Sequence, residues 1–240
     1  MSTRELNFFM ARVADQAERH EDVIKILKDL AEKDPKLNGD ERNLLSVAYK
    51  ALTGSRRTAL RTVNAFLDED SIKTNEDRKK ALEKLRDTLT KELDDYCNDL
   101  IKLVTDKEKG LINADPDPST KVFYYKLAAD YYRYSVEFKE GADRDKGAEE
   151  AKKAYENAME LAKDKLQKAN PQYLGLALNY SVFLYEIAGK KKEAITLADD
   201  TFQGAVDFLD ELSEEEYSEA TLVLQLLKDN VSLWNEEQQQ

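Results

Sequence analysis

Residues 170–189 read NPQYLGLALNYSVFLYEIAG, a stretch whose two ends are both marked in the sequence. Asn170 is a favoured N-cap and Pro171 suits the first turn of a helix, whereas Gly189 is typical of a C-terminal cap. Inside this stretch the only charged residue is Glu186. A helix this apolar is expected to lie at the centre of a helical fold, where its few polar side chains need partners or line a cavity.

The helical pattern continues along nearly the whole chain, because apolar residues recur at helical spacing and strand-like alternation is rare. The four prolines stand where helices are expected to begin or break, and Ser213 with Glu216 matches a capping box. The short connections predict antiparallel neighbours and a single domain over residues 1–240, with a polar, frayed segment at 236–240. We therefore predict an all-α protein with nine helices, near residues 3–18, 20–33, 40–68, 74–108, 119–140, 144–168, 171–188, 191–210 and 214–235.

Composition excludes several classes of protein. With 41% hydrophobic residues the chain has enough apolar side chains for a packed core, despite a charged fraction of 36%. A net charge of −12 argues against a nucleic-acid binder, which needs a surplus of Lys and Arg. The N-terminus lacks the apolar core of a signal peptide, and the least charged stretch, residues 173–188, is shorter than the roughly 20 apolar residues that cross a bilayer. We expect a cytoplasmic protein without membrane insertion, the nucleus being a second compartment to consider.

Few residues are suited to catalysis. The single histidine, His20, lies in a polar stretch that is typical of a surface or an interface. The single cysteine, Cys97, has no histidine or basic cluster nearby and is typical of a core residue. The sequence contains no glycine-rich phosphate loop. We therefore predict no enzyme activity, no metal site and no cofactor.

One segment departs from the acidic average of the chain. Lys50 and Arg57 in this segment lie about 20° apart around a helix axis, and Arg61 follows one turn later. A solvated helix face is the ordinary explanation of a charge run, but such a face usually mixes the two signs. Like charges side by side instead indicate that an anionic ligand offsets them. Between residues 42 and 61 there are five basic residues and no acidic one, namely Arg42, Lys50, Arg56, Arg57 and Arg61.

Three further segments place polar side chains on one face of a predicted helix. Each face taken alone fits an ordinary core stripe whose amide or charge is satisfied by neighbours. Taken together, the faces could build an amphipathic groove with one basic and one apolar wall. They consist of Lys126, Asp130, Arg133, Tyr134 and Glu137; of Asn179, Val182 and Glu186; and of Leu226, Asn230, Leu233 and Trp234.

Four blocks of the sequence are long enough to compare with known families. They are ERNLLSVAYK followed by GSRR within residues 41–57, KVFYYK followed by DYYRY within 121–134, LGLALNYSVF at 174–183, and the final helix over 221–234. In this order, and over nearly the whole chain, the blocks resemble the 14-3-3 family. The chain departs from the usual family pattern at Ala51, Leu60 and Ala128, and the effect of these departures on peptide preference stays open.

The resemblance implies a cup-shaped fold of nine antiparallel helices with an amphipathic groove. Helices 1–4, about residues 3–108, would form the dimerisation half and the basic wall, and helices 5–9, about 119–235, the rest of the groove. It implies a phosphoserine- or phosphothreonine-dependent adaptor that clamps phosphorylated client proteins, without catalysis. The family's phosphate-binding positions match Lys50, Arg57, Arg133 and Tyr134, and its peptide-binding positions match Asn179, Asn230, Glu186, Trp234, Lys126, Leu178, Val182, Leu226 and Leu233.

The resemblance also implies a homodimer, or a heterodimer with another 14-3-3 protein. Arg19 and Glu92 match one family salt bridge, whereas Asp22 lacks its usual lysine partner because Thr88 stands at that position. Exposed ion pairs typically contribute less than about 1 kcal/mol, so a dimer is still expected. The interface positions match Val13, Ala17, Arg19, Asp22, Ala59, Val63, Leu85 and Glu92.

Two alternatives remain open from the sequence. Residues 123–162 and 174–209 resemble helix-hairpin repeats, as in a tetratricopeptide-like scaffold that binds unmodified peptides. The other helices show no convincing 34-residue period, which weakens that interpretation. The other alternative is an enzyme, for which His20 and Cys97 are the only candidates.

Overall fold

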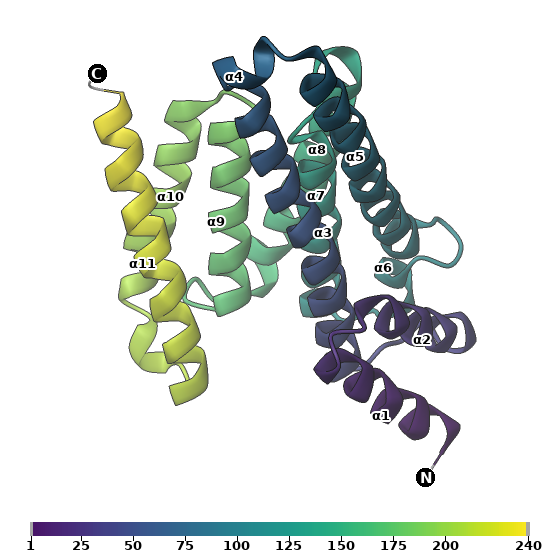
Figure 1. The fold of residues 1–240 in the computed structure, drawn as a ribbon. Coiled ribbons are helices and arrows are strands. Elements are labelled where there is room, and N and C mark those ends of the chain that lie inside the picture. Colours follow the sequence, from purple (N-terminus) through teal and green to yellow (C-terminus); the bar gives the residue numbers. More distant parts are fainter. Residues whose placement is uncertain (1, 239–240) are drawn as a thin grey trace. The chain divides into compact units, whose positions relative to one another are not determined.

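The computed structural model describes residues 2–238, and every regular element in this range is helical (Figure 1). The all-α prediction is therefore confirmed, and so are its nine long helices. They are α1 Thr3–Gln16, α2 His20–Lys33, α3 Gly39–Leu67, α5 Glu76–Thr105, α7 Pro118–Val136, α8 Gly141–Lys165, α9 Pro171–Glu186, α10 Lys191–Val206 and α11 Glu214–Glu237. The prediction lacked three short elements, because three or four residues show no periodicity: α4 Asp70–Lys73, α6 Leu111–Ala114 and the 3-10 turn η1 Leu209–Glu211.

The helix ends follow the signals in the sequence. The side chain of Asn170 accepts hydrogen bonds from two backbone N–H groups in the first turn of α9, as an N-cap does. Gly189, in the turn after α9, has a φ of 67°, a conformation that glycine adopts without strain. Ser213 and Glu216 form the predicted capping box at the start of α11.

Some predicted ends differ from the observed ones. α7 ends at Val136 and α10 at Val206, each four residues earlier than predicted, and the predicted end of α10 lies in η1. α11 continues to Glu237, where the Glu237 carboxylate accepts a hydrogen bond of 2.6 Å from the Tyr185 hydroxyl of α9. This bond ties the last turn of α11 to its neighbour. Residues 239 and 240 of the segment predicted to fray lie outside the described residues.

The chain folds as two compact units that divide between Asp115 and Pro116. In the first unit α3 packs against α2 and α5, and α1 packs against α2 (Figure 1, purple to blue). Its core contains fully buried side chains from these helices, of which each leucine stabilises the fold by roughly 1.5–3 kcal/mol. They include Leu27, Leu45, Tyr49, Leu60, Cys97 and Leu100.

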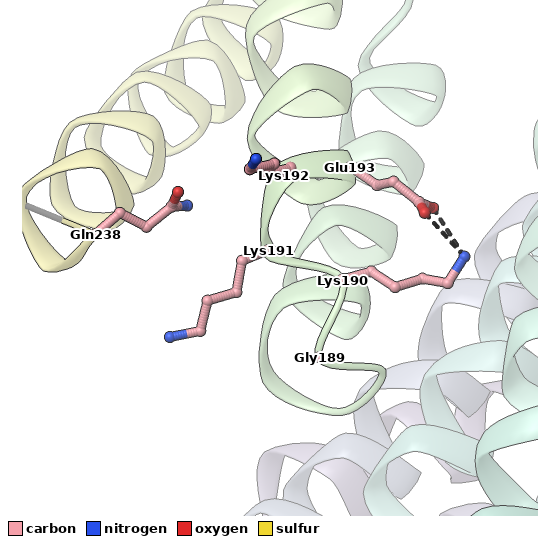
Figure 2. Close-up of a pocket in the computed structure, with 6 residues that line it drawn as sticks. All are labelled: Gly189, Lys190, Lys191, Lys192, Glu193 and Gln238. Atoms are coloured by element: carbon pink, nitrogen blue, oxygen red, sulfur yellow. Dashed lines mark hydrogen bonds and ion pairs between the residues drawn. The ribbon is translucent and has the colours of Figure 1, made fainter.

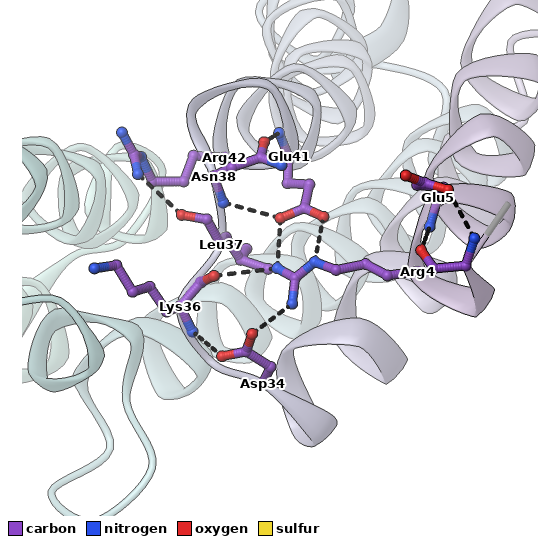
Figure 3. A network of polar contacts seen from close by, with 9 residues as sticks. Arg4, Glu5, Asp34, Lys36, Leu37, Asn38, Glu41 and Arg42 are labelled. Carbon is purple, nitrogen blue, oxygen red and sulfur yellow. Dashed lines mark hydrogen bonds and ion pairs between the residues drawn. The ribbon is translucent and has the colours of Figure 1, made fainter.

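An ion-pair network fixes α1 to the start of α3 (Figure 3). Arg4 donates two hydrogen bonds to the buried carboxylate of Glu41, of 2.8 and 2.6 Å, and a third of 2.7 Å to Asp34. Glu41 also accepts from the backbone N–H of Asn38, completing a capping box. Burial raises the pKa of Glu41, but the bonds from Arg4 and Asn38 outweigh it and hold the pKa below its ordinary value.

In the second unit α7 packs against α8, and α9 packs against α8, α10 and α11 (Figure 1, teal to yellow). The predicted central helix is observed, because Leu174, Leu176, Ala177 and Phe183 of α9 are all buried in one apolar core. Small alanines on α8 and α10 allow the helices to approach closely. Among the described residues, no helix is long and apolar enough to cross a membrane.

Candidate functional site

The basic segment predicted between residues 42 and 61 lies on α3 in the first unit. Lys50 is exposed, and Arg57 is half-buried. Arg56, by contrast, donates a 2.9 Å hydrogen bond to Glu92 of α5, and its guanidinium lies 5.2 Å from the centre of the Tyr96 ring. Glu92 therefore offsets the charge of Arg56.

The second unit contains a buried polar cluster, which we call the Asp130 cluster. Asp130 and Arg133 of α7 have exposed fractions of only 5% and 9%. The cluster joins α7 to the two helices that follow it, and it is arranged around a single carboxylate. It consists of Lys126, Asp130 and Arg133 of α7, Tyr155 of α8 and Asn179 of α9.

Every other member of the Asp130 cluster lies within reach of the Asp130 carboxylate. Lys126 Nζ donates to Oδ2 at 2.9 Å, and Asn179 Nδ2 lies 2.9 Å from both carboxylate oxygens. The Tyr155 hydroxyl donates to Oδ1 and accepts from Arg133 Nε at 3.2 Å. Arg133 Nη2 lies 3.6 Å from Oδ1. Asp130 therefore orients two cations and an amide through direct contacts.

Burial raises the pKa of Asp130, but the charges of Lys126 and Arg133 outweigh it and keep the pKa below its ordinary value. Tyr155 is also fully buried, and burial together with the adjacent carboxylate raises its pKa well above 10. At neutral pH the carboxylate is thus charged and the tyrosine carries its proton, as the hydrogen bonds require. The cluster then holds two positive charges against one negative charge.

The ring of Tyr134 contacts the Arg133 side chain of this cluster. The guanidinium carbon of Arg133 is 4.7 Å from the centre of the half-buried Tyr134 ring, a cation–π distance. Four of the predicted site residues, Lys126, Arg133, Tyr134 and Asn179, are therefore adjacent in the second unit. The other two phosphate-binding candidates, Lys50 and Arg57, belong to the first unit.

The apolar candidates lie on α9 and α11, which pack against each other. On α9, Leu178 and Val182 are half-buried and Glu186 is exposed. On α11, the large apolar side chains of Leu226 and Leu233 have exposed fractions of 46% and 51%. Asn230 lies between them and is half-buried. α11 therefore presents an apolar stripe with one amide to its surroundings.

Trp234 differs from its neighbours because it is buried. Its ring stacks on Tyr185 of α9, with centroids 4.5 Å apart and planes within 9°. The Nζ atom of Lys191 lies 5.0 Å from the centre of the Tyr185 ring. The stack holds the end of α11 against α9, so Trp234 has a clear packing role.

A shallow hollow of about 370 Å³ lies at the turn between α9 and α10 (Figure 2). Figure 2 shows three consecutive lysines around it, of which Lys190 pairs with Glu193 at 3.0 Å. None of the site residues predicted from the sequence lines this hollow, whose lining residues are Gly189, Lys190, Lys191, Lys192, Glu193 and Gln238.

The interface candidates all lie in the first unit. Val13 and Leu85 are exposed at 43% and 46%, whereas Val63 is buried within its own chain at 5%. Within the chain, Arg19 pairs with Asp22, and Glu92 pairs with Arg56 as described above. Ala17 is exposed and Ala59 half-buried.

Sequence reasoning missed two groups of residues. Tyr155, the link between Arg133 and Asp130, lies 22 residues after Arg133 in an ordinary amphipathic helix. Leu6, Phe9 and Met10 continue the exposed side of α1 from Val13 and have exposed fractions of 47–51%. Their spacing of three, one and three residues is the signal that could have identified this stripe.

The two enzyme candidates of the sequence lie on different helices, His20 on α2 and Cys97 on α5. Cys97 is fully buried, and His20 Nε2 lies 3.9 Å from Asp15. Within residues 2–238, no group of three or more His, Cys, Asp or Glu side chains is placed to hold a metal ion.

Comparison with known proteins gives a consistent result. The sequence model of the 14-3-3 protein family matches residues 10–235. The chain is 41% identical to 14-3-3 protein epsilon of Drosophila melanogaster over 239 residues, which cover 100% of this chain and 90% of the relative. It is 41% identical to 14-3-3 protein 5 of Solanum lycopersicum, covering 99% and 93% of the two chains. It is 42% identical to 14-3-3-like protein GF14-12 of Zea mays, covering 97% and 88%.

Proposed function

This chain belongs to the 14-3-3 protein family, and we propose that it is an adaptor that binds phosphoserine- or phosphothreonine-containing segments of other proteins. Capture of phosphorylated motifs by clustered arginines is a known recognition mode, for which this family is a standard example. The adaptor carries out no reaction of its own and acts by holding its clients.

The observation that carries this proposal is the positive surplus of the Asp130 cluster. Lys126 and Arg133 contribute two positive charges, and Asp130 contributes one negative charge. Arg133 donates through Nε to Tyr155 and lies near Asp130 through Nη2, and neither contact uses Nη1. A buried, charged donor group with such a surplus favours an anionic ligand.

A phosphorylated side chain suits these donors. The phosphate carries about −1.5 to −2 charges and three acceptor oxygens. We assign its binding to Lys50, Arg57, Arg133 and Tyr134. Each charge-assisted hydrogen bond contributes roughly 1.5–3 kcal/mol, so a few of them account for micromolar binding of roughly 8 kcal/mol after the entropic cost.

The polypeptide on either side of the phosphate is assigned to α7, α9 and α11. Asparagine amides recognise a main chain without selecting its side chains, which suits an adaptor with many clients. The exposed leucines of α11 offer apolar contact to whichever side chains flank the phosphate. The assigned residues are Lys126, Leu178, Asn179, Val182, Glu186, Leu226, Asn230, Leu233 and Trp234.

The proposed assembly is a dimer, either with a second copy or with another 14-3-3 protein. We assign the interface to the first unit, where Val13 and Leu85 are exposed apolar residues. The remaining assigned positions are Ala17, Arg19, Asp22, Ala59, Val63 and Glu92. The proposed compartment is the cytoplasm, with the nucleus as a second location.

Titration of a fluorescent phosphoserine peptide and its unphosphorylated twin tests the function. We expect micromolar binding of the first and much weaker binding of the second. Arg57→Ala and Arg133→Ala should each weaken the phosphopeptide by about 2–5 kcal/mol. Arg78→Ala, which removes an exposed arginine of α5 outside the assigned residues, is the matched control. Equal affinity for the two peptides would contradict the proposal and favour a scaffold for unmodified peptides.

A further inference from the structure

The Asp130 cluster contains two residues, Asp130 and Tyr155, for which the proposed function has no direct use. Both are nearly or fully buried, with exposed fractions of 5% and 0%. A carboxylate beside a binding site for a dianion also repels that ligand. Its presence therefore requires a reason other than attraction.

The contacts supply that reason. Lys126, Arg133 and Asn179 are three flexible side chains from two helices, and all three lie within 3.6 Å of the Asp130 carboxylate. Tyr155 adds a second restraint, because its hydroxyl bridges Arg133 Nε and Asp130. Side chains fixed before a ligand arrives lose less conformational entropy when it binds.

The carboxylate also determines which end of the Asn179 amide is available. A carboxylate only accepts hydrogen bonds, so the amide must direct its Nδ2 toward Asp130, at 2.9 Å from both oxygens. This leaves Oδ1 as the free end in these contacts. Asn179 is therefore prepared to accept a backbone N–H from a peptide.

We propose that Asp130, assisted by Tyr155, is a positioning residue for phosphopeptide recognition: it orders Arg133, Lys126 and the Asn179 amide in advance of the ligand. The inference rests on the proposed function and deepens it. On this inference the buried Asp130 carboxylate improves binding of the phosphorylated peptide because it positions the donor side chains, although its charge repels the phosphate.

Charge and geometry predict opposite results for Asp130→Asn, which keeps the size of the side chain. If charge dominated, removal of a negative group would tighten binding of the phosphoserine peptide. If positioning dominates, as we expect, the same substitution weakens binding by about tenfold, because misplaced donors lose affinity steeply. Tyr155→Phe, which alters no charge, should weaken it by about threefold.

Tyr180→Phe is the matched control for Tyr155→Phe. The Tyr180 ring stacks on Tyr155 with centroids 5.2 Å apart. Burial and the charges of Glu156 and Glu193, rather than the Asp130 carboxylate, raise the pKa of the Tyr180 hydroxyl to about 12. Removing that hydroxyl should leave peptide affinity unchanged. Equal losses in Tyr155→Phe and Tyr180→Phe would indicate a general packing effect and overturn the inference.

A second readout needs no ligand. In the free protein, the Nε–H proton of Arg133 should exchange slowly with water, because it donates to a buried hydroxyl. Nitrogen-edited NMR should show faster exchange in Tyr155→Phe and no change in Tyr180→Phe. This signature reports the order of Arg133, and thermal unfolding checks that the compared variants are equally stable, because exchange also follows global opening.

The outcomes separate the two proposals. If the wild-type protein binds both peptides equally, the proposed function fails and the positioning role falls with it. If the wild-type protein discriminates but Asp130→Asn and Tyr155→Phe bind the phosphopeptide as tightly or more tightly, only the positioning role is overturned. Should Asp130→Asn not fold, Tyr155→Phe with its control decides by the same criteria.

Discussion

Each unit of the protein buries a carboxylate against arginine, but the two carboxylates are surrounded by different charges. In the first unit, Glu41 has an exposed fraction of 1% and receives both hydrogen bonds from Arg4, which also binds Asp34 (Figure 3). In the second unit, Asp130 faces the two cations Lys126 and Arg133.

The difference in charge balance distinguishes a structural ion pair from a binding site. The positive charge of Arg4 is fully matched by carboxylates, so this network has nothing to offer an anion and serves to fix α1 to α3. The Asp130 cluster keeps a positive charge in excess. Burial is common to both, and only the charge balance separates them.

The largest effect on stability is expected for Arg4→Ala. Glu41 would remain buried without its cation, which should lower the free energy of unfolding by about 3 kcal/mol. Chemical denaturation measures this loss. The folded variant should bind the phosphopeptide with the affinity of the wild type. A loss of affinity as large as the loss of stability would show that the network of Arg4, Glu41 and Asp34 also serves binding.

The loss of stability at low pH should show how much the carboxylates of Glu41 and Asp130 contribute to the free energy of unfolding. The folded-state pKa of Glu41 and that of Asp130 are both lowered, so their stabilising contributions are complete above the pKa of the unfolded chain and disappear as the pH falls through the folded value. Stability should therefore decline below about pH 4. The decline should be shallower in both Arg4→Ala and Asp130→Asn, as measured by denaturation at a series of pH values.

Lys126→Met should have a smaller effect on stability and a clear one on binding. Asp130 keeps Arg133, Tyr155 and Asn179 as partners, so the free energy of unfolding should fall by only about 1 kcal/mol. The cluster would become neutral, and phosphopeptide affinity should drop about tenfold, or about 1.4 kcal/mol. An unchanged affinity would show that the surplus charge does not act on the ligand.

The smallest effect on stability is expected for Lys50→Ala. Lys50 is exposed on α3, so the free energy of unfolding should change by less than about 0.5 kcal/mol. Phosphopeptide binding should nevertheless weaken and become less dependent on salt, since a cation assigned to the phosphate is gone. Titrations at two ionic strengths measure both effects.

The sequence predicted what depends on local patterns. Periodicity and caps located the nine long helices, and Asn170 and Ser213 begin α9 and α11 as expected. Helix-face spacing brought Lys126, Asp130 and Arg133 together, because residues three and four apart are neighbours on a helix. These statements need only one helix at a time.

What the sequence did not reveal depends on pairs of helices. Tyr155 is one of 12 tyrosines, and nothing near it distinguishes the one whose hydroxyl bridges Arg133 and Asp130. Arg4 and Glu41 are 37 residues apart, so no spacing rule joins them. Similarly, Glu92 of α5 neutralises Arg56, which a count of charges along α3 cannot show.

The most direct test of the claim that surplus charge at the Asp130 cluster binds phosphate is the Nε–H resonance of Arg133 during a titration. The phosphoserine peptide should shift this resonance and saturate it at one peptide per chain, while the unphosphorylated twin at the same concentration leaves it in place. Identical behaviour with both peptides, or saturation of binding without any shift at Arg133, would contradict the account.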